Sequence, residues 1–247
     1  MTSIGDNTFE NCSSLRSITI PNSVTAIGNE SFAGCTSLSN IVIPNPVTAI
    51  GDNTFENCSS LRSITIPNSA TSIGNRVFAG CTSLSNIVIP NSVTSIGDGS
   101  FAECSSLRSI TISNSVTSIE ENSFAGCSSL RDIIIPDSVE YIAWDTFEGF
   151  SDITIYGVTG SYAQKYANRR NIRFKTIDEF KKTITGDLDG DGTISSTDAV
   201  LLKKYLAGSV NDGFSEEIAD LDGDGEVTSV DSVLLMKYLA GYDINIG

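Results

Sequence analysis

The chain has 247 residues, which is room for one large domain or two modest ones, and it carries 30 acidic against 15 basic residues. The net charge of -15 argues against nucleic acid or an anionic membrane surface as a partner, because both repel an acidic protein. The absence of histidine removes the commonest general base and the histidine zinc sites. No apolar run is long enough for a membrane span, and residues 1–10 lack the features of a signal peptide.

The charge falls into three blocks. Residues 1–152 hold 15 acids and 5 bases, residues 153–186 hold 2 acids and 7 bases, and residues 187–247 hold 13 acids and 3 bases. A basic strip between two acidic blocks predicts two modules with a joint between them.

A 23-residue period runs through the first block. Cysteine recurs at 12, 35, 58, 81, 104 and 127, and phenylalanine at 9, 32, 55, 78, 101, 124 and 147, with ladders of leucine and isoleucine at the same spacing. Alternate units match most closely, which indicates duplication of a 46-residue pair of coils. Self-similarity of this kind is typical of a leucine-rich solenoid, so we expect a parallel β-sheet along one face of a right-handed stack of 23-residue coils.

Each coil alternates in a way that predicts one strand. Ile18 and Ile20 flank Thr19, so this stretch is a half-buried strand with Thr19 outward, and Pro21 ends it because proline cannot donate to a neighbouring strand. The rest of the coil, from Val24 to Cys35, is expected to return through irregular structure. A lone coil buries too little apolar surface to offset the entropy of ordering it, so neighbouring coils must stack, with Ile18, Ile41 and Ile64 aligned.

The solenoid is expected to end in a cap over residues 153–176. Ser161 and Gln164 form a capping box at a helix start, and Arg169 and Arg170 suit the negative end of the helix dipole. Tyr162, Ala163, Tyr166 and Ala167 share one face of this helix, and Ile172 and Phe174 suggest a last strand. Because Ile4 falls in mid-coil, we expect Met1 to be a truncation point.

The repeat F-x-x-C-S-S-L-x-x-I-x-I-P-x-S-V-x-x-I, kept over residues 1–155, resembles the BspA-like bacterial leucine-rich repeats. The resemblance implies an extracellular, non-enzymatic protein associated with protein binding and adhesion. Together with its cap, the solenoid is expected to span residues 1–176, and a linker is predicted at 177–185.

The second module contains a duplicated acidic motif. GDLDGDGTISSTDAVLLKKYLAG spans 186–208 and ADLDGDGEVTSVDSVLLMKYLAG spans 219–241. A calcium loop needs oxygens at positions 1, 3, 5, 7, 9 and 12 and a glycine at position 6, here Gly192 and Gly225. The predicted ligands are Asp187, Asp189, Asp191, Thr193 through its carbonyl, Ser195 through a water, and Asp198; in the second loop they are Asp220, Asp222, Asp224, Glu226 through its carbonyl, Thr228 and Asp231.

Helices are expected at about 196–207 and 229–240, with Val200, Leu201, Leu202, Leu206, Val233, Leu234, Leu235 and Leu239 as their core. The motifs depart from an ordinary EF-hand, because position 12 is Asp and no amphipathic helix leads into Asp187. Two loops that are each followed by one helix resemble a small all-α type I dockerin over 186–247. The resemblance implies two calcium ions, an extracellular cellulosome, and a scaffoldin type I cohesin as partner. It places the cohesin contacts at loop positions 10, 11, 17 and 18, which are Ser196, Thr197, Lys203, Lys204, Ser229, Val230, Met236 and Lys237.

Several features allow two interpretations. No C-x-x-C zinc motif occurs among the cysteines. Neighbouring coils would place their Cα atoms at a distance that permits disulfides, but the regular repeat and the replacement of one cysteine by Phe150 favour buried free thiols. An outward row of β-branched residues, flanked by Arg16, Arg62, Arg108 and Arg131, is either a ligand face or a set chosen for strand fit; the row comprises Thr19, Val42, Thr65, Val88, Thr111 and Ile134. Asp52 and Glu56 could suggest the carboxylate pair of a glycosidase, but they lie in loops where nothing buries one of them to raise its pKa.

Three functional hypotheses follow from the two modules. The first is a non-catalytic cellulosomal protein whose solenoid binds a protein, or a cell-surface or carbohydrate ligand. The second is an enzyme of polysaccharide breakdown whose active site the sequence does not reveal. The third is an inert spacer with no ligand of its own.

Overall fold

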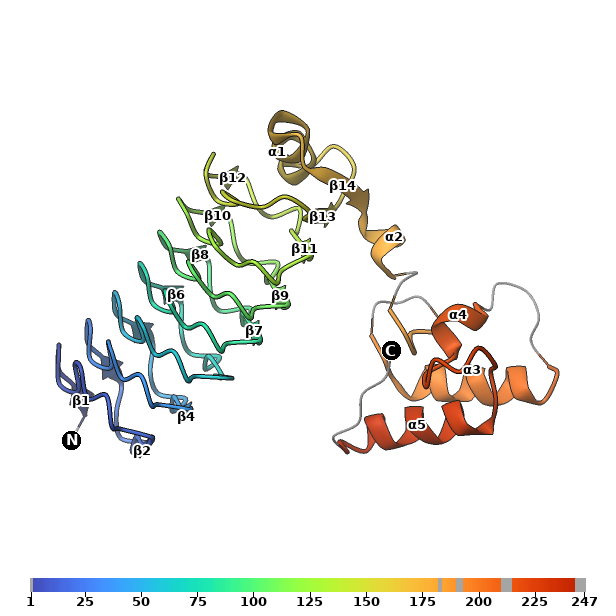
Figure 1. Ribbon diagram of the computed structural model, residues 1–247, viewed down its shortest axis with the longest axis horizontal. Helices are drawn as coiled ribbons and strands as arrows, with labels where there is room; N and C mark the ends of the chain where they lie inside the picture. The colour runs from blue at the N-terminus through green and yellow to red at the C-terminus, as the bar shows by residue number, and fades with distance from the viewer. Residues whose placement is uncertain (1, 182–183, 190–192, 210–214, 243–247) are drawn as a thin grey trace. The chain divides into compact units, whose positions relative to one another are not determined.

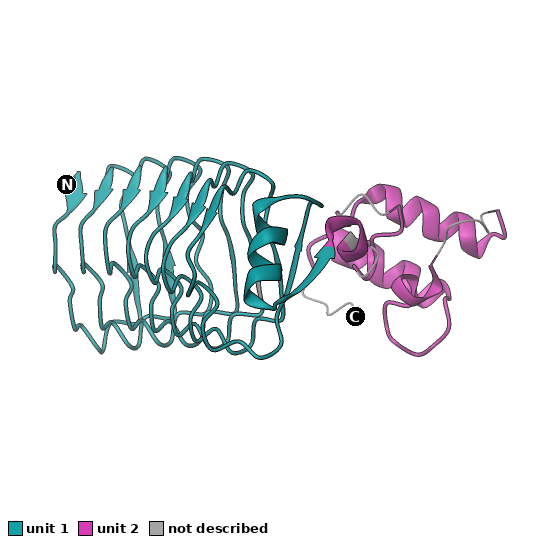
Figure 2. Ribbon diagram, turned by 90° about the horizontal axis from the view of Figure 1, so that it is seen from above, with its two compact units in different colours: residues 1–175 teal, residues 176–247 magenta. Residues whose placement is uncertain are grey.

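The computed structural model describes residues 2–181, 184–189, 193–209 and 215–242. The chain divides into two compact units, residues 1–175 and 176–247, which are shown in different colours in Figure 2. The sequence expectation placed the end of the solenoid at 176 and a linker at 177–185. Residues 177–181 instead form a short helix that belongs to the second unit.

The first unit is a parallel β-solenoid with two lines of strands (Figure 1). The first line is a seven-stranded parallel sheet in the order β1-β3-β5-β6-β8-β10-β12, which pairs each coil with the next. Its strands are β1 (Ser3–Ile4), β3 (Ala26–Ile27), β5 (Ala49–Ile50), β6 (Ser72–Ile73), β8 (Ser95–Ile96), β10 (Ser118–Ile119) and β12 (Tyr141–Ile142). This line was not expected, because the sequence predicts irregular structure there and a sheet on one face only.

The second line contains the strand that the sequence predicts. It consists of β2 (Ser17–Thr19), β4 (Asn40–Val42), β7 (Asn86–Val88), β9 (Ser109–Thr111), β11 (Asp132–Ile134), β13 (Thr154–Gly157) and β14 (Arg173–Thr176). Ile18 pairs with Ile41, and a bridge between Val42 and Thr65 carries the stack into the next coil, so the expected alignment is confirmed. The line has one two-stranded and one five-stranded sheet, because residues 63–64 in the third coil lie outside the strands.

Ladders of identical side chains fill the interior of the solenoid. The rings of Phe9, Phe32, Phe55, Phe78, Phe101, Phe124 and Phe147 stack with centroids 5.2 to 5.8 Å apart. The cysteine ladder lies beside them, with Cys12 exposed and the other five thiols buried and free, as expected of small core residues. Because every coil presents the same residues to its neighbours, each interior coil is covered on both sides.

A helix covers the C-terminal end of the stack. Helix α1 (Tyr162–Arg170) begins after Ser161, whose Oγ accepts a hydrogen bond from the Gln164 N–H at 3.2 Å. The side-chain oxygen of Gln164 accepts from the Gly160 N–H at 2.7 Å. Tyr166 lies edge-on to Phe147 with centroids 6.0 Å apart, so the helix covers the last ring of the ladder.

The second unit is helical. It contains α2 (Ile177–Lys181), α3 (Ser196–Leu206), α4 (Glu216–Ala219) and α5 (Ser229–Leu239), and α3 packs against α5. A small core of Leu188, Ala199, Leu202, Ile218, Ala219, Leu221 and Leu235 joins them. Within the part of the chain that the structure describes, no helix has the length and apolarity to cross a membrane.

The predicted core of α3 and α5 is half right. Leu202 and Leu235 are fully buried, and Leu201 and Leu234 pack against the core. The other four predicted core residues are exposed, namely Val200, Leu206, Val233 and Leu239. Two helices of a unit this small bury only the stripe that faces the shared core, and the remaining apolar positions lie at the surface.

Candidate functional site: two acidic loops and the helices after them

The first acidic loop brings its carboxylates together. Asp187, Asp189 and Asp198 offer oxygens that all lie within 4.8 Å of one another. Asp187 and Asp198 are fully buried, whereas Asp189 is exposed. The predicted ligand Asp191 and the predicted turn residue Gly192 lie outside the described residues. Thr193 is exposed and Ser195 half-buried in the remainder of the loop.

Asp198 has a structural role in this loop. Its Oδ1 accepts hydrogen bonds from the N–H groups of Leu188 at 2.7 Å and Asp189 at 3.1 Å. Its Oδ2 accepts from the Ser195 N–H at 2.7 Å, and the Ser195 Oγ caps the first turn of α3. The carboxylate at position 12 therefore ties the start of the loop to the start of the helix.

The second loop repeats this arrangement 33 residues later. Asp231 is fully buried and accepts from the N–H groups of Leu221 and Thr228, each at 2.7 Å. Asp220, Asp222 and Asp224 offer oxygens within 4.8 Å of one another. Asp220 also accepts from the N–H groups of Gly223, Asp224 and Gly225 at 2.8 to 3.2 Å, so the loop backbone wraps around its carboxylate.

The geometry of the second loop fits a hard cation. Loss of hydration raises the pKa of Asp222, and the carboxylates of Asp224, Asp231 and Asp220 raise it further. Glu226 is exposed and Thr228 is half-buried, with its Oγ accepting from the Val230 N–H at 3.1 Å. The clustered side-chain donors in both loops are carboxylate oxygens, the ligand type that calcium prefers.

The eight residues predicted to contact a partner are all exposed. They lie on or near the first turn and the second half of α3 and α5: Ser196, Thr197, Lys203, Lys204, Ser229, Val230, Met236 and Lys237. Sequence reasoning missed the apolar residues beside them, since Val200 and Val233 are 50% and 53% exposed on the same helices. The signal was present, because both motifs carry valine at the same position.

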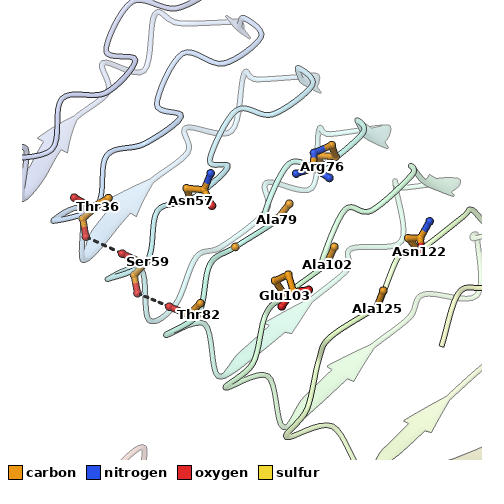
Figure 3. A pocket seen from close by; sticks show the side chains of 11 residues that line it. Thr36, Asn57, Ser59, Arg76, Ala79, Thr82, Ala102, Glu103, Asn122 and Ala125 are labelled. Carbon is orange, nitrogen blue, oxygen red and sulfur yellow. Dashed lines mark hydrogen bonds between the residues drawn. The ribbon is translucent and has the colours of Figure 1, made fainter. Parts of the chain in front are cut away.

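A pocket of about 730 Å³ lies on the solenoid (Figure 3). Small side chains of Ala79, Ala102 and Ala125 form part of its lining, with Arg76 and Glu103 among them. The carboxylates considered as a glycosidase pair have other partners nearby. Glu56 forms an ion pair with Arg76 at 2.5 Å, and Asp52 accepts a hydrogen bond from the Asn75 N–H at 2.8 Å.

Comparison with known families agrees with both modules. The profile of the BspA type leucine rich repeat region matches in six copies, over residues 2–106 and 48–167. The chain belongs to this family. The profile of the dockerin type I domain matches residues 185–240, so the second unit contains a type I dockerin domain. Both are families of non-catalytic binding modules. No curated protein matches the chain.

Solved structures of bacterial leucine-rich repeat proteins resemble the solenoid. A leucine rich cell surface protein from Faecalibacterium prausnitzii is 40% identical, with a TM-score of 0.60 over 64% of this chain and 43% of that protein. A leucine-rich repeat protein from Bacteroides ovatus is 25% identical, with a TM-score of 0.50 over 71% of this chain and 55% of that one. The pneumococcal vaccine antigen PcpA is 20% identical, with a TM-score of 0.56 over 66% of this chain and 41% of the PcpA chain. This likeness shows a shared fold. The chain thus spans about half the length of these proteins, or less.

Proposed function

We propose that this chain is a non-catalytic cellulosomal binding protein. Its dockerin, residues 186–247, attaches it to a scaffoldin type I cohesin when calcium is bound, and its solenoid, residues 1–176, displays a binding surface for a protein or cell-surface ligand. The observation that carries the proposal is the duplicated unit of an acidic loop and a capped helix, in which the same positions repeat at an offset of 33 residues.

Each loop is proposed to hold one calcium ion. Asp187, Asp189 and Asp198 supply a preformed cluster in the first loop, to which Asp191, Thr193 and Ser195 add oxygens. In the second loop Asp220, Asp222 and Asp224 form the cluster, to which Glu226, Thr228 and Asp231 add oxygens. An ion in each loop would neutralise carboxylates that repel one another and hold the loop against the first turn of its helix.

The exposed faces of α3 and α5 are proposed to bind the cohesin. Hydroxyls at loop positions 10 and 11 and the lysines in the second half of each helix supply polar contacts, as in Ser196 and Lys204. Val200 and Val233 lie on these helices and supply apolar area at the centre of a contact. Attachment to a scaffoldin further implies an extracellular location, which accords with the family of the solenoid.

Isothermal titration calorimetry of the full chain with a type I cohesin tests the attachment. Binding is expected in calcium and absent after chelation, and equal binding with and without calcium would contradict the proposal. The double variant Asp187→Ala with Asp220→Ala is a test without chelator and should behave like the calcium-free chain. A hydrolysis assay on plant polysaccharides separates this function from that of an enzyme, because turnover would overturn the non-catalytic assignment.

A further inference from the structure

The charge of the solenoid is segregated between its sides. One side of the solenoid carries β2, β4, β7 and β9 and lies at the lower right of the coils in Figure 1. We call this side the strand face and define it over the first five coils by residues 13–22, 36–45, 59–68, 82–91 and 105–114. It contains no Asp, no Glu and no aromatic residue. The seven acids of residues 1–119 all lie outside it, so the strand face carries only positive charge, up to Asp132 and Asp137 in the next coil.

Three arginines form a column on the strand face. Arg16, Arg62 and Arg108 are exposed and occupy the same position in alternate coils, with Ser39 and Ser85 between them. The Ser39 N–H donates to the Arg16 carbonyl at 3.1 Å, the Ser85 N–H to the Arg62 carbonyl at 3.3 Å, and the Arg108 N–H to the Ser85 carbonyl at 2.9 Å. These bonds hold the column in register. Since paired strands lie about 4.7–4.9 Å apart, the guanidinium groups repeat about every 9.5 Å.

These arginines are available for a ligand. Among the residues that the structure describes, none of the three forms an ion pair, whereas Arg76 on another side of the solenoid pairs with Glu56 at 2.5 Å. Arg16 and Arg62 border a groove of about 320 Å³. The rest of its lining is hydroxyl-bearing: Ser37, Ser39, Ser60 and Ser83.

Apolar groups follow the same two-coil period. Val42 and Val88 are each 66% exposed, and they alternate with the exposed threonines Thr19, Thr65 and Thr111 along the outward row of the sheet. The strand face therefore presents a cation and an exposed valine once every two coils. Isolated exposed valines need no explanation, but a periodic row beside a periodic row of unpaired arginines indicates a repetitive ligand.

We propose, on the basis that the solenoid displays a binding surface as proposed above, that the strand face binds an acidic, proline-rich peptide in the polyproline II conformation. This helix has three residues per turn and a rise of about 3.1 Å, so an acidic residue at every third position places a carboxylate on the same side about every 9.3 Å. That spacing matches the arginine column to within a few tenths of an ångström. Arginine recognises carboxylates through paired, charge-assisted hydrogen bonds, and proline rings between them contact Val42 and Val88.

Other acidic ligands fit this surface less well. An extended β-strand returns to the same side at every second residue, about 6.6 Å, which is out of step with the arginines. An α-helix with acids at a spacing of seven residues repeats at about 10.5 Å and drifts by about 1 Å at each step. Polysaccharides bind largely through stacking of sugar rings on aromatic side chains, which the strand face lacks.

The test measures binding of fluorescent peptides to the full chain in calcium-containing buffer by fluorescence anisotropy. A peptide of repeated Pro-Pro-Glu is expected to bind, with an affinity that falls as salt is raised. Two control peptides separate charge from spacing. A Pro-Pro-Gln repeat keeps the spacing and removes the charge. A peptide with the composition of the Pro-Pro-Glu repeat, but with its glutamates gathered at one end, keeps the charge and removes the three-residue spacing. The triple variant Arg16→Gln, Arg62→Gln and Arg108→Gln is expected to weaken binding roughly 30-fold, since each exposed ion pair contributes a factor of about three.

Arg76→Gln is the matched control and should leave binding unchanged, and circular dichroism checks that each variant is folded. Equal affinity for all three peptides, unchanged affinity of the triple variant, or preferential binding of polygalacturonate over the Pro-Pro-Glu repeat would each overturn the inference. Cohesin binding is measured on the same samples. If the chain binds cohesin and a pulled-down ligand of another kind but does not bind the peptide, this inference is wrong and the proposed function stands.

Discussion

The thiol of Cys81 donates a hydrogen bond to the carbonyl oxygen of Phe55, 3.2 Å away in the preceding coil. The same bond recurs at each buried cysteine, from Cys35 to Cys127, at 3.0 to 3.2 Å. Each of these carbonyls also accepts the backbone N–H of the cysteine three residues further along its own coil, as Phe55 does from Cys58 at 3.1 Å, so the thiol supplies a second bond to an oxygen that has two lone pairs. The cysteine ladder therefore stabilises the stack through hydrogen bonds as well as through packing.

Replacing Cys81 with alanine is expected to lower the free energy of unfolding of the solenoid by about 1–3 kcal/mol, because it leaves a small cavity and removes one of the two hydrogen bonds to the Phe55 carbonyl, which keeps the bond from the Cys58 N–H at 3.1 Å. Chemical denaturation of the variant measures this. Cys12→Ala is the matched control, because Cys12 is exposed and should change stability by less than about 0.5 kcal/mol. Equal effects at the two positions would contradict the role assigned to the buried thiol.

The buried thiols are expected to resist alkylation. Burial raises the pKa of Cys58 and of Cys127 to about 12, and it raises the pKa of Cys81 and Cys104 as well. Because the thiolate is the reactive form, iodoacetamide at pH 8 should label Cys12 alone in the native protein. Mass spectrometry should find all six cysteines labelled after denaturation. Rapid native labelling of Cys58 would show that the core is not packed as described.

A ladder of Asp and Asn side chains joins neighbouring coils at another corner. Each side-chain Oδ1 accepts a hydrogen bond from the backbone N–H one coil further on: Asp6 accepts from Asn29 and Asn29 accepts from Asp52, both at 2.8 Å. The ladder continues through Asp52, Asn75 and Asp98. Charged and neutral members alternate along it, so no two carboxylates are direct neighbours between Asp6 and Asp98.

Asn29→Asp is expected to place three carboxylates in a row, about 4.8 Å apart from coil to coil. The repulsion should destabilise the solenoid by about 1 kcal/mol at low salt, and screening should remove most of this loss at high salt. Thermal unfolding at two salt concentrations checks the effect. Asn45→Asp adds the same charge at an exposed position outside the ladder and should show a smaller dependence.

The sequence predicts the coil length and one line of strands because Ile18 and Ile20 alternate around an exposed Thr19. It misses the other line because strands such as Ala26–Ile27 have two residues, too few to show an alternation. Their strand character comes from pairing with the coils on either side, which is tertiary. For the acidic loops, the spacing predicts which aspartates gather, but not the hydrogen bonds of Asp198 to the loop backbone.

The exposed Val200 and Val233 show a second limit of sequence reasoning. Helical periodicity places them next to the apolar core positions, and nothing local distinguishes a buried valine from one on an exposed binding face. The assignment depends on which face of α3 meets α5. Burial of Leu202 and Leu235 at that contact leaves the two valines outside.

Removal of calcium is expected to unfold the dockerin and leave the solenoid intact. The loops bring together the carboxylates of Asp187 and Asp189 and of Asp220, Asp222 and Asp224. Without an ion to neutralise them, the repulsion between these carboxylates opposes a core as small as the one around Leu202. Calorimetry should show the transition of the C-terminal unit disappear in excess chelator while that of the solenoid remains. An unchanged trace would contradict the dependence of this unit on metal.

The two segments that are proposed to bind the cohesin are expected to differ in strength. They are related by duplication, so the dockerin can present either one in orientations rotated by about half a turn. The first segment offers two hydroxyls and two ammonium groups, in Ser196, Thr197, Lys203 and Lys204. In the second segment Val230 replaces one hydroxyl and Met236 replaces one ammonium group, and these side chains are 50% and 46% exposed. Charge-assisted bonds to an acidic cohesin surface are worth more than the contacts that replace them, so the first orientation should dominate.

Paired variants measured by calorimetry with a type I cohesin separate the two orientations. Ser196→Ala with Thr197→Ala is expected to weaken binding only in part, roughly tenfold for the loss of about 1.4 kcal/mol of polar contacts, because the second orientation remains available. Addition of Ser229→Ala and Lys237→Ala should weaken the remaining binding further, since the second orientation then loses its hydroxyl and ammonium contacts and the first keeps only those of Lys203 and Lys204. If the second pair alone abolishes binding and the first has no effect, the dominant face is the one formed by Ser229 and Lys237.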